Sequence, residues 1–415
     1  MELFDLSDKT ERVILVGVQE NDGDDTEESL QELAELAKTA GAEVVGTVIQ
    51  KRERIHPGTY VGKGKIDEIR TLLNALDATG IICDDELSPV QMNHLQQELE
   101  SKIMDRTLLI LDIFASRAVT KEGKIQVELA QLRYRAVRLV GLGSSLSRLG
   151  GGIGTRGPGE KKLEMDRRLI KERISQLKKE LEHVKKHREL LREGRKKDRV
   201  MTAAIVGYTN AGKSTLLNTL TDAGVLSEDK LFATLDPTTR LLELDGGQRI
   251  YLTDTVGFIR KLPHHLIEAF KSTLEEAKYA DVILHVVDAS NPQVEEQMFI
   301  VYETLRELGV KDKTIVTLFN KQDSLAGNEI LRDFKADYVL KISARTGLGL
   351  DELKNTLEKI LIGNQIYIER VLDYKDAGML QLVRKYGQLI EEKYTENGIE
   401  IKARVPKDIY GRLGE

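Results

Sequence analysis

The chain has 415 residues, 40% of them hydrophobic and 31% charged, with a formal net charge of −6. This length predicts about two to four domains, and the composition excludes an intrinsically disordered chain. The single cysteine, Cys83, excludes an intramolecular disulfide and a thiolate metal cage. The first residues form no signal peptide, and no apolar run approaches the roughly 20 residues of a membrane span. We therefore expect a cytoplasmic protein without a membrane span.

Residues 1–115 alternate between apolar strand-like runs and helical patterns. The predicted strands cover residues 12–18, 43–50, 80–84 and 105–114. The predicted helices lie near residues 26–40, 65–78 and 88–101. Strands rich in Val, Ile and Leu that alternate with helices are typical of a parallel sheet covered on both faces. We therefore expect a small amino-terminal α/β domain.

Residues 116–199 show helical patterns and no strand. A helix is predicted over residues 125–141, and a second one over about 160–193 carries an apolar seven-residue repeat. The members of the repeat are Leu163, Ile170, Leu177, Val184 and Leu191, with Ile174 and Leu181 at the intermediate spacing. Such a seam needs a partner helix. The pattern predicts an antiparallel helical hairpin with the glycine-rich segment 141–162 at its tip.

The remaining chain returns to strand–helix alternation. Strands are predicted at residues 201–207, 249–257, 281–290, 314–321 and 336–344 of a domain that covers residues 200–362. Residues 363–415 carry two short alternating strands, at 365–371 and 399–405, on either side of a helix-like stretch at 377–392. We expect a small carboxy-terminal α+β module there.

The motif GYTNAGKST, residues 207–215, follows the first of these strands. It fits the P-loop pattern G-x-x-x-x-G-K-[ST], which requires a strand before it and a helix after it. Gly207 and Gly212 allow backbone N–H groups to turn toward phosphate oxygens at the positive end of the helix. We expect Lys213 to neutralise the terminal phosphates and Ser214 to offer its hydroxyl to Mg²⁺.

The motif DTVG, residues 254–257, ends the next predicted strand. A carboxylate at this end of a strand suits the Mg²⁺ shell, which is the role expected for Asp254. Gly257 leaves its N–H group for a γ-phosphate. A plain turn after a strand is the alternative for this motif alone.

NKQD at 320–323 and SAR at 343–345 each follow a predicted strand. An ionised carboxylate only accepts hydrogen bonds, so Asp323 suits guanine, which presents two adjacent donors, and not adenine. A mismatched base leaves a buried carboxylate unpaired, which discriminates strongly. The backbone of the SAR segment is expected near guanine O6. Four motifs in this order predict a GTP-binding domain.

The four motifs resemble those of the translation-factor class of P-loop GTPases. FATLDPTTR at 232–240, DTVGFIRKLP at 254–263 and the loop at 145–168 are similar to the HflX family, and the resemblance extends over nearly the whole chain. It implies an α/β fold in which a P-loop GTPase domain follows a small parallel α/β domain and a long helical hairpin and precedes a small α+β module. HflX proteins bind the large ribosomal subunit and, in several bacteria, split stalled ribosomes.

The resemblance also implies roles for individual residues. The residues it assigns to GTP binding are Gly207, Tyr208, Thr209, Asn210, Ala211, Gly212, Lys213, Ser214, Thr215, Phe232, Ala233, Thr234, Leu235, Asp236, Asp254, Thr255, Val256, Gly257, Asn320, Lys321, Gln322, Asp323, Ser343, Ala344 and Arg345. Catalysis falls to Lys213, Thr234, Asp254 and Gly257, with Asp254 acting through water. Mg²⁺ falls to Ser214 and Thr234. We choose Thr234 over Thr238 and Thr239 because related GTPases place this threonine in an F-A-T-L setting.

Phe258 stands where Ras-like GTPases carry a glutamine that orients the attacking water. A phenyl ring makes no such hydrogen bond. One interpretation is that Phe258 only packs within a switch region. The other is that hydrolysis is slow in the isolated protein and is completed by groups from a partner.

The segment 141–162 contains eight glycines and no second G-K-[ST], so we do not expect it to bind a nucleotide. Residues 156–199 carry 17 Lys or Arg against 9 Asp or Glu, a local excess of +8 that leaves −14 for the rest. We expect Arg148, Arg156, Lys161 and Lys162 to contact ribosomal RNA phosphates at the tip of the hairpin. The alternative is a coiled-coil linker with a slack turn.

A second glycine-rich stretch, HPGTYVGKGKIDE at 56–68, lacks P-loop spacing because Lys63 stands where a glycine is needed. We interpret it as a loop of glycine turns before a helix, with phosphate or RNA contact as the alternative. Its spacing argues against an ATP-driven RNA remodeller. The predicted function is a ribosome-stimulated GTPase that splits ribosomes, with Mg²⁺ as cofactor, GTP, GDP and the large subunit as partners, and a monomeric state. The alternative is a GTP-dependent binding switch in large-subunit assembly or quality control.

Overall fold

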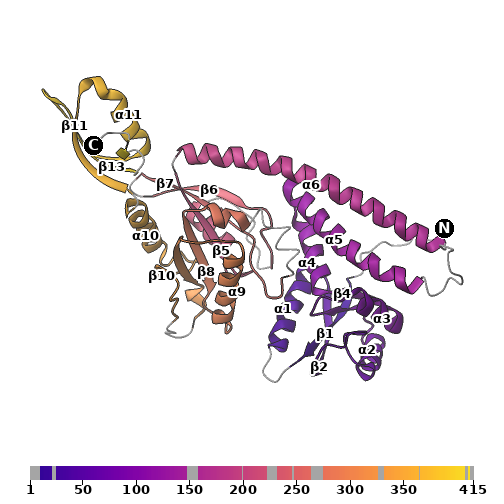
Figure 1. Cartoon of the computed structure of the whole chain (residues 1–415). Coiled ribbons are helices and arrows are strands. Elements are labelled where there is room, and N and C mark those ends of the chain that lie inside the picture. Colours follow the sequence, from indigo (N-terminus) through magenta and orange to yellow (C-terminus); the bar gives the residue numbers. More distant parts are fainter. Residues whose placement is uncertain are drawn as a thin grey trace, which may run out of the picture. The chain divides into compact units, whose positions relative to one another are not determined.

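The computed structural model describes residues 10–20, 25–146, 158–198, 200–221, 231–244, 247–262, 274–325, 331–363, 365–406 and 410–411. The chain divides into two compact units, and Figure 1 labels most of their elements. Unit 1 consists of Met1–Lys185, Glu228–Asp236 and Val256–Leu274. Unit 2 consists of Lys186–Ser227, Pro237–Thr255 and Glu275–Glu415.

Unit 1 contains a four-stranded parallel sheet, as the alternation of strands and helices predicts. Its strands are β1 (Arg12–Gln19), β2 (Glu43–Lys51), β3 (Gly80–Cys83) and β4 (Lys102–Asp105), in the order β2-β1-β3-β4. The accompanying helices are α1 (Thr26–Thr39), α2 (Lys63–Ala75), α3 (Pro89–Leu99) and α4 (Arg106–Arg117). One apolar core joins β1 and β3 to α2 and α3 through buried residues that include Ile14, Ile69, Ile81 and Leu95. Apolar strands flanked by amphipathic helices bury both faces of such a sheet.

The strand predicted over residues 105–114 is wrong beyond its first residue. Strand β4 ends at Asp105, and the apolar run that follows forms helix α4. The Asp105 side chain accepts a hydrogen bond from the backbone N–H of Leu108, which caps the helix. Because most residues of this helix are buried, its sequence lacks the periodicity that distinguishes a helix from a buried strand.

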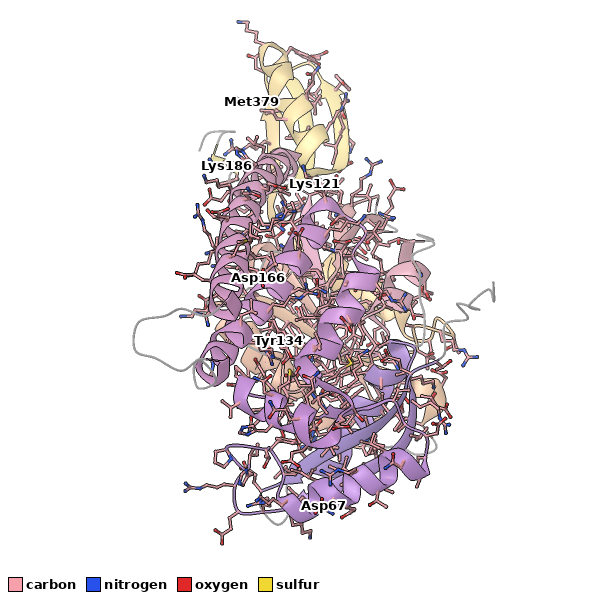
Figure 2. All side chains as sticks on the ribbon, turned by 90° about the vertical axis from the view of Figure 1, so that its right-hand side faces the viewer. Asp67, Lys121, Tyr134, Asp166, Lys186 and Met379 are labelled. Atoms are coloured by element: carbon pink, nitrogen blue, oxygen red, sulfur yellow. The ribbon has the colours of Figure 1, made fainter. Side chains whose placement is uncertain are left out.

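The helical hairpin consists of α5 (Lys121–Leu146) and α6 (Pro158–Asp198). Ile125 and Leu129 of α5 pack against Leu177 of α6. Arg173 pairs with Glu128 at 2.8 Å, whereas Arg167 donates to the carbonyl oxygen of Leu139 at 2.7 Å, so the two helices are antiparallel. Figure 2 shows the chain passing along α5 from Lys121 to Tyr134 and returning along α6 through Asp166. The predicted pairing of the seven-residue repeat is therefore confirmed for its central members.

The tip segment is shorter than predicted. Residues 141–146 continue α5, and residues 158–162 begin α6. Pro158 suits the first position of a helix because its missing N–H group has no partner to lose there.

Unit 2 is built on a six-stranded sheet in the order β10-β9-β8-β5-β7-β6, in which only the β6–β7 pair is antiparallel. The strands are β5 (Met201–Gly207), β6 (Thr238–Glu243), β7 (Arg249–Asp254), β8 (Val282–Asp288), β9 (Thr314–Asn320) and β10 (Tyr338–Lys341). The helices of this unit include α7 (Lys213–Thr221), α9 (Val294–Glu307), the 3-10 turn η1 (Gln322–Ser324) and α10 (Leu350–Gly363). Buried residues of the central strands and of α7 and α10 form one core. The parallel strands place the ends of β5, β7, β8 and β9 at one edge of the sheet.

The carboxy-terminal module has three antiparallel strands, β11 (Gln365–Leu372), β12 (Gln388–Thr395) and β13 (Gly398–Pro406), in the order β11-β13-β12. Helix α11 (Ala377–Tyr386) follows the 3-10 turn η2 (Tyr374–Asp376) and contributes Leu380 and Val383 to the core of the module. The helix predicted over residues 377–392 is wrong beyond Tyr386. Residues from Gln388 onward pair with β13 instead. A Cβ at Gly387 would lie 2.6 Å from the carbonyl oxygen of Arg404, so only glycine allows the chain to turn this close to β13.

Candidate guanine nucleotide site

The P-loop connects β5 to α7 at the carboxyl edge of the unit 2 sheet. A Cβ at Gly207 would lie 2.2 Å from the carbonyl oxygen of Val286 on β8. At Gly212, where φ is +96°, it would lie 2.3 Å from Asn320 Nδ2. Lys213 begins α7, and its ammonium group donates to the carbonyl oxygen of Tyr208 at 2.6 Å. The two glycines are therefore required by their neighbours, and the lysine folds back over the loop.

The expected Mg²⁺ side of the site brings Ser214 and Asp254 together. The Ser214 hydroxyl donates to Asp254 Oδ2 at 2.7 Å, and Asp254, the last residue of β7, is completely buried. Lys213 is only 6% exposed. Burial lowers the pKa of Lys213 to about 8, although the Asp254 carboxylate opposes the shift. This edge of the sheet therefore holds a buried cation, Lys213, whose charged form a phosphate group would stabilise. It also holds two hard oxygen donors, Ser214 and Asp254.

The expected base side of the site is held together by Asn320, the last residue of β9. Its Nδ2 donates to the carbonyl oxygen of Ala211 at 2.8 Å, and its Oδ1 accepts from the backbone N–H of Ala344 at 2.8 Å. One side chain thus ties the P-loop to the SAR segment. The Ser343 hydroxyl donates to Asp323 Oδ1 at 2.6 Å, and this bond lowers the pKa of Asp323. Asp323 is therefore held as an ionised acceptor, which is the form that guanine requires.

Two supporting residues were not predicted from the sequence. Asp288, at the end of β8, pairs with Lys321 at 2.7 Å. Thr219 of α7 donates to the carbonyl oxygen of Ala344 at 2.8 Å. Asp288 could have been found because it is a carboxylate at the carboxyl end of a strand, as Asp254 is. Thr219 carries no such signal within its helix.

The segments that contain the other predicted residues belong to unit 1. In the first, residues 231–236, the Phe232 ring meets the Phe114 ring edge-on with centroids 4.7 Å apart. The Asp236 carboxylate accepts hydrogen bonds from the backbone N–H groups of Val119 and Thr120. The structure therefore gives this carboxylate a partner at the start of α5. Thr234 lies between these two contacts along the chain.

Thr238 and Thr239 both lie in β6. Thr239 Oγ1 is 2.9 Å from Thr253 Oγ1 on the paired strand β7, and Thr238 pairs in register with Asp254. Strand pairing therefore engages the backbone of both residues, and the choice of Thr234 as the switch threonine stays a prediction.

The second segment, residues 256–262, lies against acidic residues of unit 1. Lys261 Nζ is 2.5 Å from Asp84 Oδ2 and 2.8 Å from Asp85 Oδ1. Arg260 pairs with Asp25, and its carbonyl oxygen accepts from the buried guanidinium of Arg106 at 3.3 Å. These contacts are long-range in sequence and were not predicted.

Phe258 of the same segment is 1% exposed, so its ring is buried. The ring is therefore packed, as the first interpretation expects, and the slow-hydrolysis hypothesis stays a prediction.

Arg106 forms the centre of a buried ion cluster in unit 1. It lies 2.7 Å from Asp84 Oδ1 and 2.7 Å from Glu32 Oε1. Burial alone raises the pKa of Asp84, but Arg106 and Lys261 outweigh it, so the net pKa is lowered. The cluster therefore stays ionised at neutral pH and fixes residues 260 and 261.

Four residues are predicted to contact RNA, and the structure describes the backbone of only two of them. Arg148 and Arg156 lie outside the described residues, and Lys161 and Lys162 belong to the first turns of α6. Their RNA contacts stay a prediction.

Comparison with known families and proteins agrees with the motifs. Residues 27–115 match the model described as GTP-binding GTPase N-terminal, residues 117–195 the GTP-binding GTPase Middle Region, and residues 202–321 the 50S ribosome-binding GTPase. GTPase HflX of Lacrimispora saccharolytica is 67% identical over 414 residues, which cover 100% of this chain and 98% of the relative. The chain belongs to the HflX family of GTPases.

A second relative, GTPase HflX of Caldanaerobacter subterraneus subsp. tengcongensis, is 50% identical over 413 residues, which cover 99% of this chain and 94% of that protein. The solved complex of SsGBP with GDP is 28% identical, with a TM-score of 0.49, and covers 85% of this chain and 98% of that one. As a member of the HflX family with a P-loop GTPase domain, the protein is a GTP hydrolase.

GTPases of this kind generally use a divalent metal, and Ser214 and Asp254 fit one. Hydroxyl and carboxylate oxygens are the donors that hard divalent cations prefer, and Mg²⁺ is usually held by one or two protein ligands plus substrate phosphates. Within the described ranges, no group of three or more His, Cys, Asp or Glu side chains forms a separate metal site. Nor does any helix in this part of the chain combine the length and apolarity needed to cross a membrane.

Proposed function

We propose that this HflX GTPase binds the large ribosomal subunit and splits stalled or idle ribosomes as it hydrolyses GTP to GDP and phosphate. The observation that carries the proposal is helix α6. It runs without a break for 41 residues, from the hairpin tip at Pro158 to Asp198, a length of about 60 Å. β5 begins at Met201, three residues after the described end of α6, and ends at Gly207, the first residue of the P-loop. The helix of the basic arm is thus followed in the chain by the strand that ends at the phosphate-binding loop.

The charges of the arm favour RNA as its target. The chain is acidic as a whole, so a local excess of +8 over residues 156–199 is concentrated and not general. Contacts to phosphates dominate the affinity of such surfaces and make binding fall with salt. A family model described as 50S ribosome-binding GTPase matches residues 202–321, which supports the large subunit as the source of that RNA.

The residues of the site suggest how the chain performs hydrolysis. Lys213 and the P-loop backbone would hold the phosphates, Ser214 and Thr234 would coordinate Mg²⁺ directly, and Asp254 would act on it through water. The metal, when bound, would neutralise charge on the β- and γ-phosphates. The N–H group of Gly257 would meet the γ-phosphate. Asp323, held ionised by Ser343, would select guanine.

Sedimentation of intact ribosomes with the protein and GTP, or with a non-hydrolysable analogue, tests the proposal. We expect free subunits with either nucleotide because binding of the triphosphate form would drive splitting. Replacing GGGIGTRGPG, residues 150–159, by a short neutral turn should abolish splitting and leave GTP affinity intact. Retained splitting in that variant would contradict the role of the tip.

The same experiment distinguishes the alternative function. A GTP-dependent switch in large-subunit assembly or quality control would bind the subunit and release no subunits from intact ribosomes. Co-sedimentation with the large subunit, without splitting, would therefore favour that alternative.

Phe258 leads to a second test of the hydrolysis step. Because its ring is buried and cannot orient water, we propose that hydrolysis is slow in the isolated protein and is completed on the ribosome. Single-turnover GTPase assays with and without ribosomal subunits measure this difference. Equal hydrolysis rates with and without ribosomal subunits would contradict this hypothesis.

A further inference from the structure

We propose that Asp236 is a positioning residue that holds Thr234 in place by anchoring its segment to the start of helix α5. The inference rests on the proposed function, in which Thr234 coordinates Mg²⁺ in the GTP state. It extends the set of residues that support GTP binding to one whose hydrogen-bond partners lie outside the phosphate-binding loops. All of the contacts that support it are made within unit 1.

The Asp236 carboxylate is bound by three donors at the beginning of α5. Oδ2 accepts from the backbone N–H of Val119 at 3.0 Å and from that of Thr120 at 2.9 Å. Oδ1 accepts from the Thr120 hydroxyl at 2.5 Å. The hydroxyl oxygen in turn accepts from the backbone N–H of Gly123 at 3.0 Å, so Thr120 caps the helix while it binds Asp236. A carboxylate at this end is also favoured by the helix dipole.

Gly123 shows how close this contact is. A Cβ at residue 123 would lie 2.5 Å from Asp236 Oδ1 and 3.2 Å from Asp236 Cγ. Glycine lowers the stability of a helix relative to alanine, so its presence in the first turn of α5 is locally unfavourable. The position of the carboxylate supplies a reason for it.

A second anchor holds the other end of the segment. Phe232 is 2% exposed and adopts a φ of +56°, which is uncommon for a bulky residue. Its ring packs edge-on against Phe114 of α4 with the ring planes at 72°. Thr234 is two residues from each anchor. Its backbone therefore has little freedom unless Phe232 or Asp236 releases, and the cost of ordering it on binding is reduced in advance.

GDP lacks the γ-phosphate whose binding brings Thr234 to the metal, so the anchor should act on GTP affinity and not on GDP affinity. We expect Asp236→Ala to weaken GTP binding about tenfold, the effect of losing hydrogen bonds to a charged group. GDP affinity should stay within twofold, and this unchanged value also shows that the P-loop is folded. Thr120→Val should weaken GTP binding by about threefold, and Thr120→Ser, which keeps the hydroxyl, should restore it.

Gly123→Ala supplies the sharpest test. Alanine normally stabilises a helix relative to glycine, whereas here it should weaken GTP binding. In the wild type we expect it to weaken GTP binding by about threefold, since the new methyl group displaces the carboxylate. In the Asp236→Ala background it should have no effect on GTP affinity. Gly64→Ala is the matched control: Gly64 also lies in the first turn of a helix, α2, and a Cβ there meets nothing within 4 Å.

Titration calorimetry with GTP and GDP at fixed Mg²⁺ separates the possible failures. An unchanged ratio of GTP to GDP affinity in Asp236→Ala, or equal effects of Gly123→Ala in both backgrounds, would overturn the inference. Thr234→Ala tests the proposed role of the threonine itself and should lower the ratio at least as much as Asp236→Ala. A normal ratio in Thr234→Ala would overturn that role, whereas a lowered ratio there with a normal ratio in Asp236→Ala would overturn the anchor alone.

Discussion

Two glycine-rich loops in this protein follow a parallel strand and precede a helix, yet their glycines have different causes. In the P-loop, Gly207 and Gly212 stand where a Cβ would lie within 2.3 Å of a neighbouring strand or side chain. In the loop between β2 and α2, a Cβ at Gly58 would lie 3.5 Å from the His56 ring, an ordinary contact, and Gly64 faces open space. A Cβ at Gly62 would lie 2.6 Å from Arg52 Nη1, which is the far end of a flexible side chain and not backbone. The first loop is therefore fixed by backbone and a buried side chain, whereas the second is not.

Three N–H groups of the second loop are bound by side chains of the loop or of strand β2. His56 Nδ1 accepts from the backbone N–H groups of Gly58 and Thr59 at 3.2 and 3.1 Å, and Gln50 Oε1 accepts from that of Gly62 at 2.8 Å. A phosphate would have to displace these partners. Glycine content alone therefore does not identify a phosphate-binding loop; the neighbours of each glycine and the partners of each N–H group do.

The two loops should differ most in GTP affinity when the lysine of each loop is removed. We expect Lys213→Ala to lower GTP affinity about a thousandfold, which is about 4 kcal/mol, because a buried cation beside phosphates is lost. Lys63→Ala, at the start of α2, should leave GTP affinity within twofold. Titration calorimetry measures both. A comparable loss in the two variants would mean that the amino-terminal loop also serves this nucleotide.

Replacing the first glycine of each loop by alanine should change the free energy of unfolding by different amounts. We expect Gly207→Ala to destabilise unit 2 by about 2 kcal/mol because its Cβ would lie 2.2 Å from the Val286 carbonyl oxygen of the adjacent strand. Gly58→Ala should change the free energy of unfolding by less than about 0.5 kcal/mol. Urea unfolding followed by circular dichroism provides the measurement. Equal losses would show that the surroundings of Gly58 are as restrictive as those of Gly207.

The same contrast explains what the sequence could predict. The P-loop, Asp254, Asn320 and Ser343 follow strands at fixed spacing, so local pattern and chemistry suffice to place them at one edge of the sheet. Helix α4 was assigned as a strand because a buried apolar run has no period, although Asp105 three residues before Leu108 was a capping signal.

Contacts between distant residues were beyond the reach of local patterns. Asp236 meets Thr120 across 116 positions, and Lys261 meets Asp84 across 177. Each motif had been interpreted within the nucleotide site, and nothing in FATLD or FIRK indicates an external partner. Gly123 precedes the helix predicted over residues 125–141, so its place in the first turn of α5 was not predicted either.

The lowered pKa of Lys213 predicts proton uptake on nucleotide binding. In the free protein burial lowers this pKa to about 8, so at pH 8.5 most molecules carry a neutral amine. Phosphate favours the ammonium form and raises the pKa again, so binding takes up most of one proton at pH 8.5 and little at pH 6.5. Affinity should fall by up to about tenfold per pH unit above pH 8.

Calorimetry in two buffers with different ionisation enthalpies counts these protons. Lys63→Ala should keep the uptake, and Lys213→Arg, which stays charged at pH 8.5, should abolish it. Uptake that persists in Lys213→Arg would assign the proton to another group.

The smallest expected effect is a difference in acid stability between the two units, which follows from their buried polar groups. In unit 2, His285 of β8 is 1% exposed, with Asp333 Oδ2 at 3.9 Å from its Nδ1 and the Tyr302 ring edge-on to it. Burial lowers the pKa of His285 below its ordinary value of 6.5, with Lys213 adding to the shift, although Asp333 opposes it. In unit 1 the buried cation at the centre of the ion cluster is Arg106, which stays charged at any pH that the fold survives.

Acid should therefore weaken unit 2 before unit 1. The folded state keeps His285 neutral, whereas the unfolded chain binds a proton below pH 6.5. The stability of unit 2 is then complete above that pH and falls below it, by about 1 kcal/mol between pH 6.5 and 5.5. Hydrogen exchange of β8 and β9 should accelerate over this range once corrected for intrinsic rates, and that of β1 and β3 should not. His285→Asn should remove the difference in pH dependence between the two sheets, because of His285 and Arg106 only His285 titrates between pH 6.5 and 5.5. Acceleration of β8 exchange that persists in this variant would assign the acid sensitivity to another group of unit 2.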